Sequence, residues 1–313
     1  MKENMTMKNN NLDKKLVINE EKCIHCGLCE KTCWNGALKL TGENRTPAMV
    51  ITEITDEWHL CWECQRCLAV CPTGALSICG KDPADSLPRE MIPSPESVEA
   101  LIANRRSCRS FQQKNVDKDL IYNILFACGN SPTGSCNQIM EFTVIDDIDV
   151  MKEFTSLLQK EMFEKLEEGI HPPRFDFDDM AMIKSRYDAG EEFCFRGAPH
   201  LLIAHAPIGK GEWVFDTGIA LGYAELLMEA NGLGFIYVST PWAALQICPK
   251  TRAFLQIPEN HYISCPVGFG WPAYHFKRGV QRQDVFKINR LTSAEGKEVL
   301  YKPMREAKVS RQE

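Results

Sequence analysis

Two short cysteine-rich stretches decide the fold of the N-terminal part of the chain. Residues 23–33 read CIHCGLCEKTC, and residues 61–71 read CWECQRCLAVC. Both have the spacing C-x2-C-x2-C-x3-C, and together they hold eight of the 15 cysteines. Thiolates bind iron–sulfur clusters and zinc alike, but zinc modules use two C-x2-4-C pairs and seldom need a third cysteine in the same run. The spacing therefore indicates two [4Fe–4S] clusters, with zinc as the alternative.

The fourth cysteine of each run is expected to bind the cluster of the other run. Three cysteines at two-residue gaps can occupy three corners of one iron–sulfur cube, whereas the fourth is carried away on a short helix. The ligands are then Cys23, Cys26, Cys29 and Cys71 for cluster one, and Cys61, Cys64, Cys67 and Cys33 for cluster two. The runs resemble bacterial dicluster ferredoxins. Trp34 stands where that family usually has proline, and the segment between the runs, about residues 38–57, is longer.

The composition excludes several classes of protein. The chain has 313 residues, of which 44% are hydrophobic and 25% charged, which is typical of a folded protein of about two domains. Its net charge of −6 argues against a general nucleic-acid binder. No apolar run approaches the ~18 residues of a membrane helix, and residues 1–15 lack the apolar core of a secretory signal. We therefore expect a cytoplasmic protein without nucleic-acid or membrane partners.

A proline-rich segment separates two predicted domains. Residues 81–96 read KDPADSLPREMIPSPE, in which four prolines indicate an extended connection. A boundary near residue 90 gives a domain at 1–90 and another at 91–313. In the second domain, apolar periodicity predicts helices over 116–128, 150–167 and 219–228, the last capped by Asp216, and strands at 142–145, 201–204, 235–238 and 262–267. This irregular alternation predicts an α+β fold with a central mixed sheet surrounded by helices.

An arginine-rich segment opens the second domain. Residues 105–111 read RRSCRSF, and arginine and serine side chains are good donors to phosphate, although a basic surface turn explains such a segment equally well. It is followed in order by SPTGSCNQ at 131–138, GLG at 232–234 and GFGWP at 268–272. This ordered series resembles the nitroreductase family of FMN enzymes over about residues 96–290. The whole chain resembles the nitroreductase-like proteins that carry a fused ferredoxin domain.

The resemblance implies an FMN site at the interface of a homodimer. The implied cofactor-binding residues are Arg105, Arg106, Ser107 and Arg109 at the phosphate and ribityl tail, Pro132, Thr133, Gly134, Cys136, Asn137 and Gln138 in the loop that reaches the flavin, Ser239 and Thr240 near flavin N5, and a late phosphate-binding arginine, Arg282 or Arg278. Cys136 stands where the family usually has asparagine. No catalytic side chain is expected, because the flavin carries the chemistry.

Together the two domains predict an iron–sulfur flavoprotein oxidoreductase. We expect two [4Fe–4S] clusters to exchange electrons with FMN, which reduces a small oxidant of the nitroaromatic, quinone or activated-alkene class. The donor is either reduced ferredoxin or NAD(P)H. Two alternatives stay open: a non-enzymatic electron carrier or redox sensor, and an enzyme that modifies the flavin itself.

Overall fold

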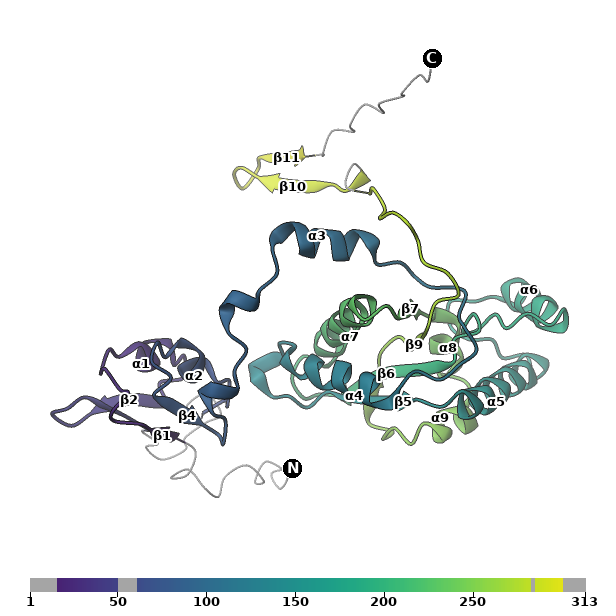
Figure 1. Cartoon of the computed structure of the whole chain (residues 1–313). Helices are drawn as coiled ribbons and strands as arrows, with labels where there is room; N and C mark the ends of the chain where they lie inside the picture. The colour runs from purple at the N-terminus through teal and green to yellow at the C-terminus, as the bar shows by residue number, and fades with distance from the viewer. Residues whose placement is uncertain (1–15, 50–60, 283–284, 301–313) are drawn as a thin grey trace, which may run out of the picture. The chain divides into compact units, whose positions relative to one another are not determined.

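The computed structural model describes residues 16–49, 61–282 and 285–300, and these divide into two compact units (Figure 1). Unit 1 comprises Met1–Ile92 together with Pro132–Ile139, and unit 2 comprises Pro93–Ser131 and Met140–Glu313. The expectation for residues 1–15, and much of the long segment between the cysteine runs, lies outside the described residues. Among the helices of the described ranges, none has the length and apolar character that crossing a membrane requires.

The cysteine repeat of the sequence is also a structural repeat in unit 1. Its elements are β1 (Leu16–Ile18), α1 (Leu28–Thr32), β2 (Leu38–Thr41), β3 (Thr46–Met49), α2 (Arg66–Val70) and β4 (Leu76–Ile78). Strand β1 pairs with β4, and β2 pairs with β3, both antiparallel. Each helix follows a residue in the left-handed conformation, Gly27 or Gln65, and ends just before the fourth cysteine of its run, so that Cys33 or Cys71 is the C-cap. The two short helices therefore carry the fourth cysteines away from the first three, as the spacing predicts.

The sheet of unit 2 is buried on both faces. Its strands are β5 (Glu141–Ile145), β6 (His200–Pro207), β7 (Gly234–Tyr237), β8 (His261–Ile263) and β9 (Val267–Gly270), in the order β5-β6-β9-β7 with β8 also beside β6. Side chains alternate along β6: Leu201 and Ile203 join one core cluster, and Leu202 and Ala204 join the other. The named strand pairs are antiparallel, and a parallel bridge from Ser107 to Phe235 adds the arginine segment beside β7.

Helices cover the two faces of this sheet. The helices of unit 2 are α3 (Pro95–Asn104), α4 (Lys118–Ala127), α5 (Ile148–Glu167), α6 (Phe177–Asp188), α7 (Trp213–Ala230), α8 (Ser239–Ala244) and α9 (Pro249–Phe254), and a hairpin of β10 (Ile288–Leu291) and β11 (Lys297–Leu300) follows. No residue of α3 is buried, so α3 takes no part in covering the sheet. Residues of α5 pack in the first cluster, and residues of α4 and α7 pack in the second. The predicted α+β class is confirmed. Two details of the prediction were wrong: Asp216 lies inside the first turn of α7, and residues 262–267 form the separate strands β8 and β9.

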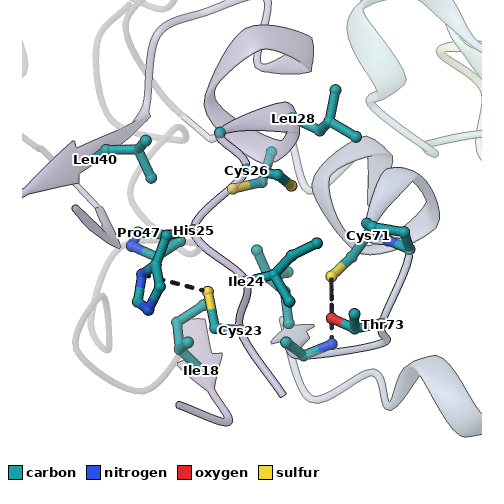
Figure 2. A pocket seen from close by; sticks show the side chains of 15 residues that line it. Ile18, Cys23, Ile24, His25, Cys26, Leu28, Leu40, Pro47, Cys71 and Thr73 are labelled. Carbon is teal, nitrogen blue, oxygen red and sulfur yellow. Dashed lines mark hydrogen bonds between the residues drawn. The ribbon is translucent and has the colours of Figure 1, made fainter. Parts of the chain in front are cut away.

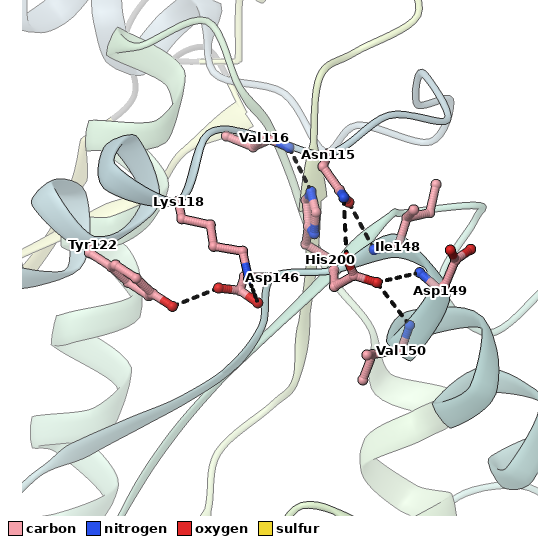
Figure 3. A network of polar contacts seen from close by, with 10 residues as sticks. Asn115, Val116, Lys118, Tyr122, Asp146, Ile148, Asp149, Val150 and His200 are labelled. Carbon is pink, nitrogen blue, oxygen red and sulfur yellow. Dashed lines mark hydrogen bonds and ion pairs between the residues drawn. The ribbon is translucent and has the colours of Figure 1, made fainter.

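A polar network fixes the segment that follows the arginine-rich stretch (Figure 3). The Val116 N–H donates to His200 Nε2 over 3.0 Å, and the Ile148 N–H donates to Asn115 Oδ1 over 2.8 Å. Asp146 accepts from the Tyr122 hydroxyl over 2.6 Å and lies 3.3 Å from Lys118 Nζ. These contacts join the start of α4, the end of β5 and the start of α5, so residues 115–118 have a fixed position on unit 2.

Candidate cofactor sites

Four cysteines drawn from both runs line one hollow in unit 1 (Figure 2). Cys23, Cys26 and Cys29 come from the loop before α1 and from α1 itself, and Cys71 comes from the end of α2. The remaining wall is largely apolar and includes Ile18, Ile24, Leu28, Leu40 and Pro47. The hollow therefore gathers the four cysteines that the spacing assigns to cluster one.

A second hollow in unit 1 gathers the other predicted set. Cys61, Cys64 and Cys67 of the second run line it together with Cys33 of the first run. Trp34 and Trp62 also contribute to its wall, and the Trp34 side chain is 78% exposed. Within the part of the chain that the structure describes, no three His, Cys, Asp or Glu side chains approach closely enough to share a single metal ion. The cysteines instead surround hollows, four to each.

The thiols in these hollows are not equivalent. Burial raises the pKa of Cys67 to about 12, and the neighbouring Cys61, Cys64 and Cys33 add to that rise. At Cys71, partial burial also acts to raise the thiol pKa, but hydrogen bonds from Ala75 and Thr73 outweigh it and lower the pKa. Buried thiols that crowd one another resist ionisation unless a cation compensates them, and a bound metal would supply that charge.

A basic cavity of about 230 Å³ lies in unit 2. Its wall is formed by residues from three segments that are distant in the sequence, within 104–110, 229–234 and 272–276. The Cys108 N–H donates to the Phe235 carbonyl over 2.9 Å, and the Ala273 N–H donates to the Ser110 carbonyl over 2.9 Å. These backbone hydrogen bonds bring the arginine segment, the GLG turn and the chain after the GFGWP stretch to one place.

Three of the predicted phosphate-binding residues line this cavity, namely Arg106, Ser107 and Arg109. The Arg109 guanidinium donates to the Ser107 carbonyl over 3.3 Å, and the Arg106 guanidinium stacks 5.0 Å from the centre of the Phe276 ring. Arg105 does not line it: its Nη1 lies 3.0 Å from Glu225 Oε1 of α7, which is only 14% exposed. Burial raises the pKa of Glu225, and the Arg105 charge acts against that rise.

The two candidate late arginines are not among the residues that line the cavity. Arg278 and Arg282 are both exposed. The backbone beside Arg278 is held next to Asn104 of the cavity wall, since the Val280 N–H donates to the Ala103 carbonyl over 2.9 Å. Neither arginine therefore joins Arg106 and Arg109 in the wall.

The predicted flavin loop, Pro132–Ile139, belongs to unit 1 and has an unusual backbone. Ser135, Cys136 and Gln138 all have positive φ angles, between 51° and 52°. Burial raises the pKa of the Cys136 thiol. The buried Asn137 Oδ1 has no hydrogen-bond partner among the described residues. Strained backbone and unpaired buried polar atoms are rare and concentrate where a protein binds something.

Ser239 and Thr240 begin α8, directly after β7. Thr240 is buried and Ser239 is exposed, and neither lines the basic cavity. The Val238 N–H just before them donates to the Pro266 carbonyl over 3.0 Å. This contact fixes the junction of β7 and α8 against the segment between β8 and β9.

The sequence did not identify several residues of the basic cavity. Its wall also contains Asn104, Glu229, Tyr274, His275 and Phe276. Tyr274, His275 and Phe276 follow the GFGWP stretch after Ala273, and Asn104 precedes the arginine segment. Glu229 precedes the GLG turn by three residues. All five residues therefore lie beside motifs recognised in the sequence, and that proximity could have identified them.

Comparison with known proteins agrees with this geometry. Iodotyrosine deiodinase from Danio rerio is 24% identical over 208 residues, which cover 64% of this chain and 68% of that protein. Polyferredoxin protein MvhB from Methanothermobacter marburgensis is 36% identical over 63 residues, 20% of this chain and 13% of that protein. A crystal structure of a nitroreductase with bound FMN from Bacteroides fragilis is 20% identical and covers 62% of this chain and 99% of its own, with a TM-score of 0.50. This last similarity shows the fold of unit 2.

Two family models match the chain. The model of the 4Fe-4S dicluster domain matches residues 22–75, which contain both cysteine runs. The model of the nitroreductase family matches residues 102–271, more than half of the chain. Both resemblances drawn from the sequence are thereby confirmed. The chain is an oxidoreductase that belongs to the nitroreductase family and carries an N-terminal 4Fe-4S dicluster domain.

Proposed function

We propose that this protein is an iron–sulfur flavoprotein that holds two [4Fe–4S] clusters and FMN and reduces a small organic oxidant. One observation carries the proposal: a single chain combines two four-cysteine hollows with a basic cavity built by nitroreductase motifs. Neither feature alone requires a redox chain, but a flavin enzyme with its own iron–sulfur domain has a source of single electrons.

The cysteine hollows fit cubane clusters better than zinc. Zinc needs four ligands converging at about 2.3 Å on one ion, and no three candidate ligands of the described residues converge in that way. Each hollow takes three cysteines from one run and the fourth from the other. That exchange is the ligand pattern expected for two clusters in a dicluster ferredoxin.

The basic cavity fits the phosphate and ribityl part of FMN. Arg106 and Arg109 supply guanidinium donors and Ser107 a hydroxyl, which are groups that phosphate prefers. Bound flavin supplies the exchange of a hydride or of single electrons. The residues of this chain bind and orient it, and none is needed as a nucleophile.

We further propose that two chains assemble into a homodimer. Phe215, Ile219 and Tyr223 recur every four residues on α7 and are 68%, 39% and 41% exposed. Such a stripe of exposed apolar side chains marks an interaction surface. A homodimer would hold two FMN and four clusters. Multi-angle light scattering of FMN-loaded protein tests this, and a monomer that retains FMN would contradict it.

Several small oxidants remain in competition as substrates. The family name suggests nitroaromatics, and the motifs of the chain leave quinones and activated alkenes equally open. The similarity to iodotyrosine deiodinase supports a second candidate, reductive removal of halide from a halogenated phenol. Anaerobic turnover assays with a nitroarene, a quinone and an iodophenol, each with the same donor, separate these classes by product.

Anaerobic stopped-flow spectroscopy of the reconstituted protein tests the central proposal. Reduced ferredoxin and NAD(P)H are compared as donors while the cluster and flavin absorbance bands are followed separately. We expect the clusters to be reduced before the flavin with ferredoxin, and a small oxidant then to reoxidise the protein. Bound cofactors without turnover of any oxidant would favour a carrier or sensor. Loss of the flavin spectrum under oxygen would favour a flavin-modifying enzyme.

A further inference from the structure

The turn after the second cysteine run places two donors on the Cys71 sulfur. The Ala75 N–H donates to Cys71 Sγ over 3.3 Å, and Thr73 Oγ1 lies 3.7 Å from the same sulfur (Figure 2). Gly74, between them, has a φ of +61° and donates its N–H to the Cys71 carbonyl over 3.3 Å. A cysteine bound to iron has lost its proton, so the Thr73 hydroxyl can only donate.

Donors to a cluster sulfur change the energy of the electron that the cluster accepts. Reduction adds one negative charge to the cluster, and a hydrogen-bond donor stabilises the more negative state. A donor that is lost therefore lowers the reduction potential. Thr73 is exposed, so its side chain can be altered without changing a packed core.

The position of Cys71 decides which cluster Thr73 affects. Thr73 follows the second run in the sequence, yet Cys71 lines the hollow of Cys23, Cys26 and Cys29. In the sequence repeat the equivalent residue is Asn35, two residues after Cys33, and Asn35 lines the other hollow. At this position the hollow of cluster one therefore has a hydroxyl group, and the hollow of cluster two has an amide.

We propose that the Thr73 hydroxyl raises the reduction potential of cluster one and leaves that of cluster two unchanged. This inference rests on the proposed presence of two [4Fe–4S] clusters. Thr73 acts through Cys71 and does not itself bind iron, so it is a positioning residue that tunes the cluster. A residue next to one run in the sequence thus controls the cluster of the other.

A redox titration of the full-length protein, followed by electron paramagnetic resonance, tests the proposal. In Thr73→Val, the ratio of reduced to oxidised cluster one at a fixed potential should fall about tenfold, which is 59 mV for one electron. Thr73→Ser keeps the hydroxyl and should restore the wild-type value. Unchanged potentials in Thr73→Val, or a Thr73→Ser variant that behaves like it, would overturn the proposal.

Two single-cluster backgrounds identify the affected cluster. Cys26 and Cys64 are both exposed members of their hollows, so Cys64→Ala should keep cluster one and Cys26→Ala cluster two. Thr73→Val should shift the potential in the first background and not in the second. If either background fails to fold, Asn35→Val in the intact protein replaces it as the control. This variant should leave unchanged the reduction potential that Thr73→Val lowers. An equal shift from Asn35→Val would refute the assignment.

Iron analysis keeps this proposal separate from the proposed function. Wild-type protein with about eight irons per chain contains both clusters, and unchanged potentials in Thr73→Val then contradict only the role of Thr73. Wild-type protein that takes up zinc and no iron after anaerobic reconstitution contradicts the proposed function itself, and the role of Thr73 falls with it.

Discussion

The two cofactor regions of this protein are built in opposite ways. The cysteine hollows take every predicted ligand from two short runs, and each run folds into a loop and one helix that the sequence repeats. The basic cavity joins three segments separated by more than a hundred residues in places, and backbone hydrogen bonds align them. Local spacing is enough to specify a metal site, whereas a cavity for an organic cofactor depends on long-range packing.

The largest effect is expected from removing one cysteine of the second hollow. Cys64→Ala should lose about half of the iron, because each [4Fe–4S] cluster depends on its four thiolates. FMN binding at the basic cavity should persist, since every residue that lines this cavity belongs to unit 2. Iron analysis and the flavin spectrum measure both quantities. Cys79→Ala is the control outside the two runs, and full iron content in Cys64→Ala would refute the ligand assignment.

Acidification should distinguish the two regions next, through a buried imidazole in unit 2. His200 is fully buried, and burial lowers its pKa to about 4. Between the unfolded value of 6.5 and about 4, the unfolded state binds a proton that the folded state does not. Stability should therefore fall as the pH drops from 6.5 to 4, by up to about 1.4 kcal/mol per pH unit. In unit 1, by contrast, His25 is exposed.

Urea unfolding at several pH values, followed by flavin fluorescence, measures this dependence. His200→Gln should reduce the slope between pH 6.5 and 4. Part of the slope should remain in this variant, because burial also lowers the pKa of His205. The exposed His171, outside the basic cavity, supplies the control variant, His171→Gln, which should keep the full slope. A wild-type protein equally stable at pH 4.5 and 6.5 would show that His200 is not buried as a neutral ring.

The arginines at the basic cavity should contribute unequally to FMN binding. Arg109→Ala removes a charge-assisted contact worth about 1.5–3 kcal/mol, so FMN affinity should fall about tenfold or more. Arg105→Ala should have the smaller effect, because Glu225 already holds that guanidinium at 3.0 Å. Fluorescence titration with FMN measures both, with Arg290→Ala on the exposed hairpin as the control. A larger loss in Arg105→Ala would reverse this ranking and restore Arg105 as the main phosphate contact.

What the sequence could predict follows the same division between local and long-range structure. The two cysteine sets could be predicted because cluster ligands need a fixed spacing. The C-caps at Cys33 and Cys71 agree with that spacing. The arginine segment could be singled out as a candidate for phosphate binding, and three of its predicted residues do line a cavity. Its long-range partners could not be predicted, because the Arg105–Glu225 ion pair joins residues 120 positions apart and no local pattern indicates such a contact.

The errors in the predicted elements have a related cause. Apolar periodicity marked 262–267 as one strand, but β8 pairs with one end of β6 and β9 with the other end and with β7. The chain leaves the strand conformation between β8 and β9 because the two strands pair with different partners. In α7, the helix begins at Trp213, before the apolar pattern starts, so Asp216 is an interior residue. Tertiary partners set these boundaries, and periodicity reports only burial.

The smallest expected effect tests the backbone approach that closes the basic cavity. A Cβ on Gly234 would lie 2.6 Å from Cys108 Cβ and 2.7 Å from its Sγ, so the arginine segment would have to move away from β7. Gly234→Ala should cost about 1–3 kcal/mol of stability through overpacking. It should also weaken FMN binding, because Ser107 and Arg109 move with the arginine segment. The iron content should stay unchanged.

Two further variants decide whether this close approach is the cause. Gly129→Ala places a methyl group where no atom lies within 4 Å, so it should leave stability and FMN affinity close to wild type. Cys108→Gly combined with Gly234→Ala removes the two closest atoms that the new methyl group meets and leaves Phe111 Cε1 at 3.2 Å, so it should recover part of the lost FMN affinity. If the double variant binds FMN no better than Gly234→Ala, the contact between Cys108 and Gly234 does not align the cavity. The wall must then depend on the hydrogen bond from Cys108 N–H to Phe235, which both variants retain.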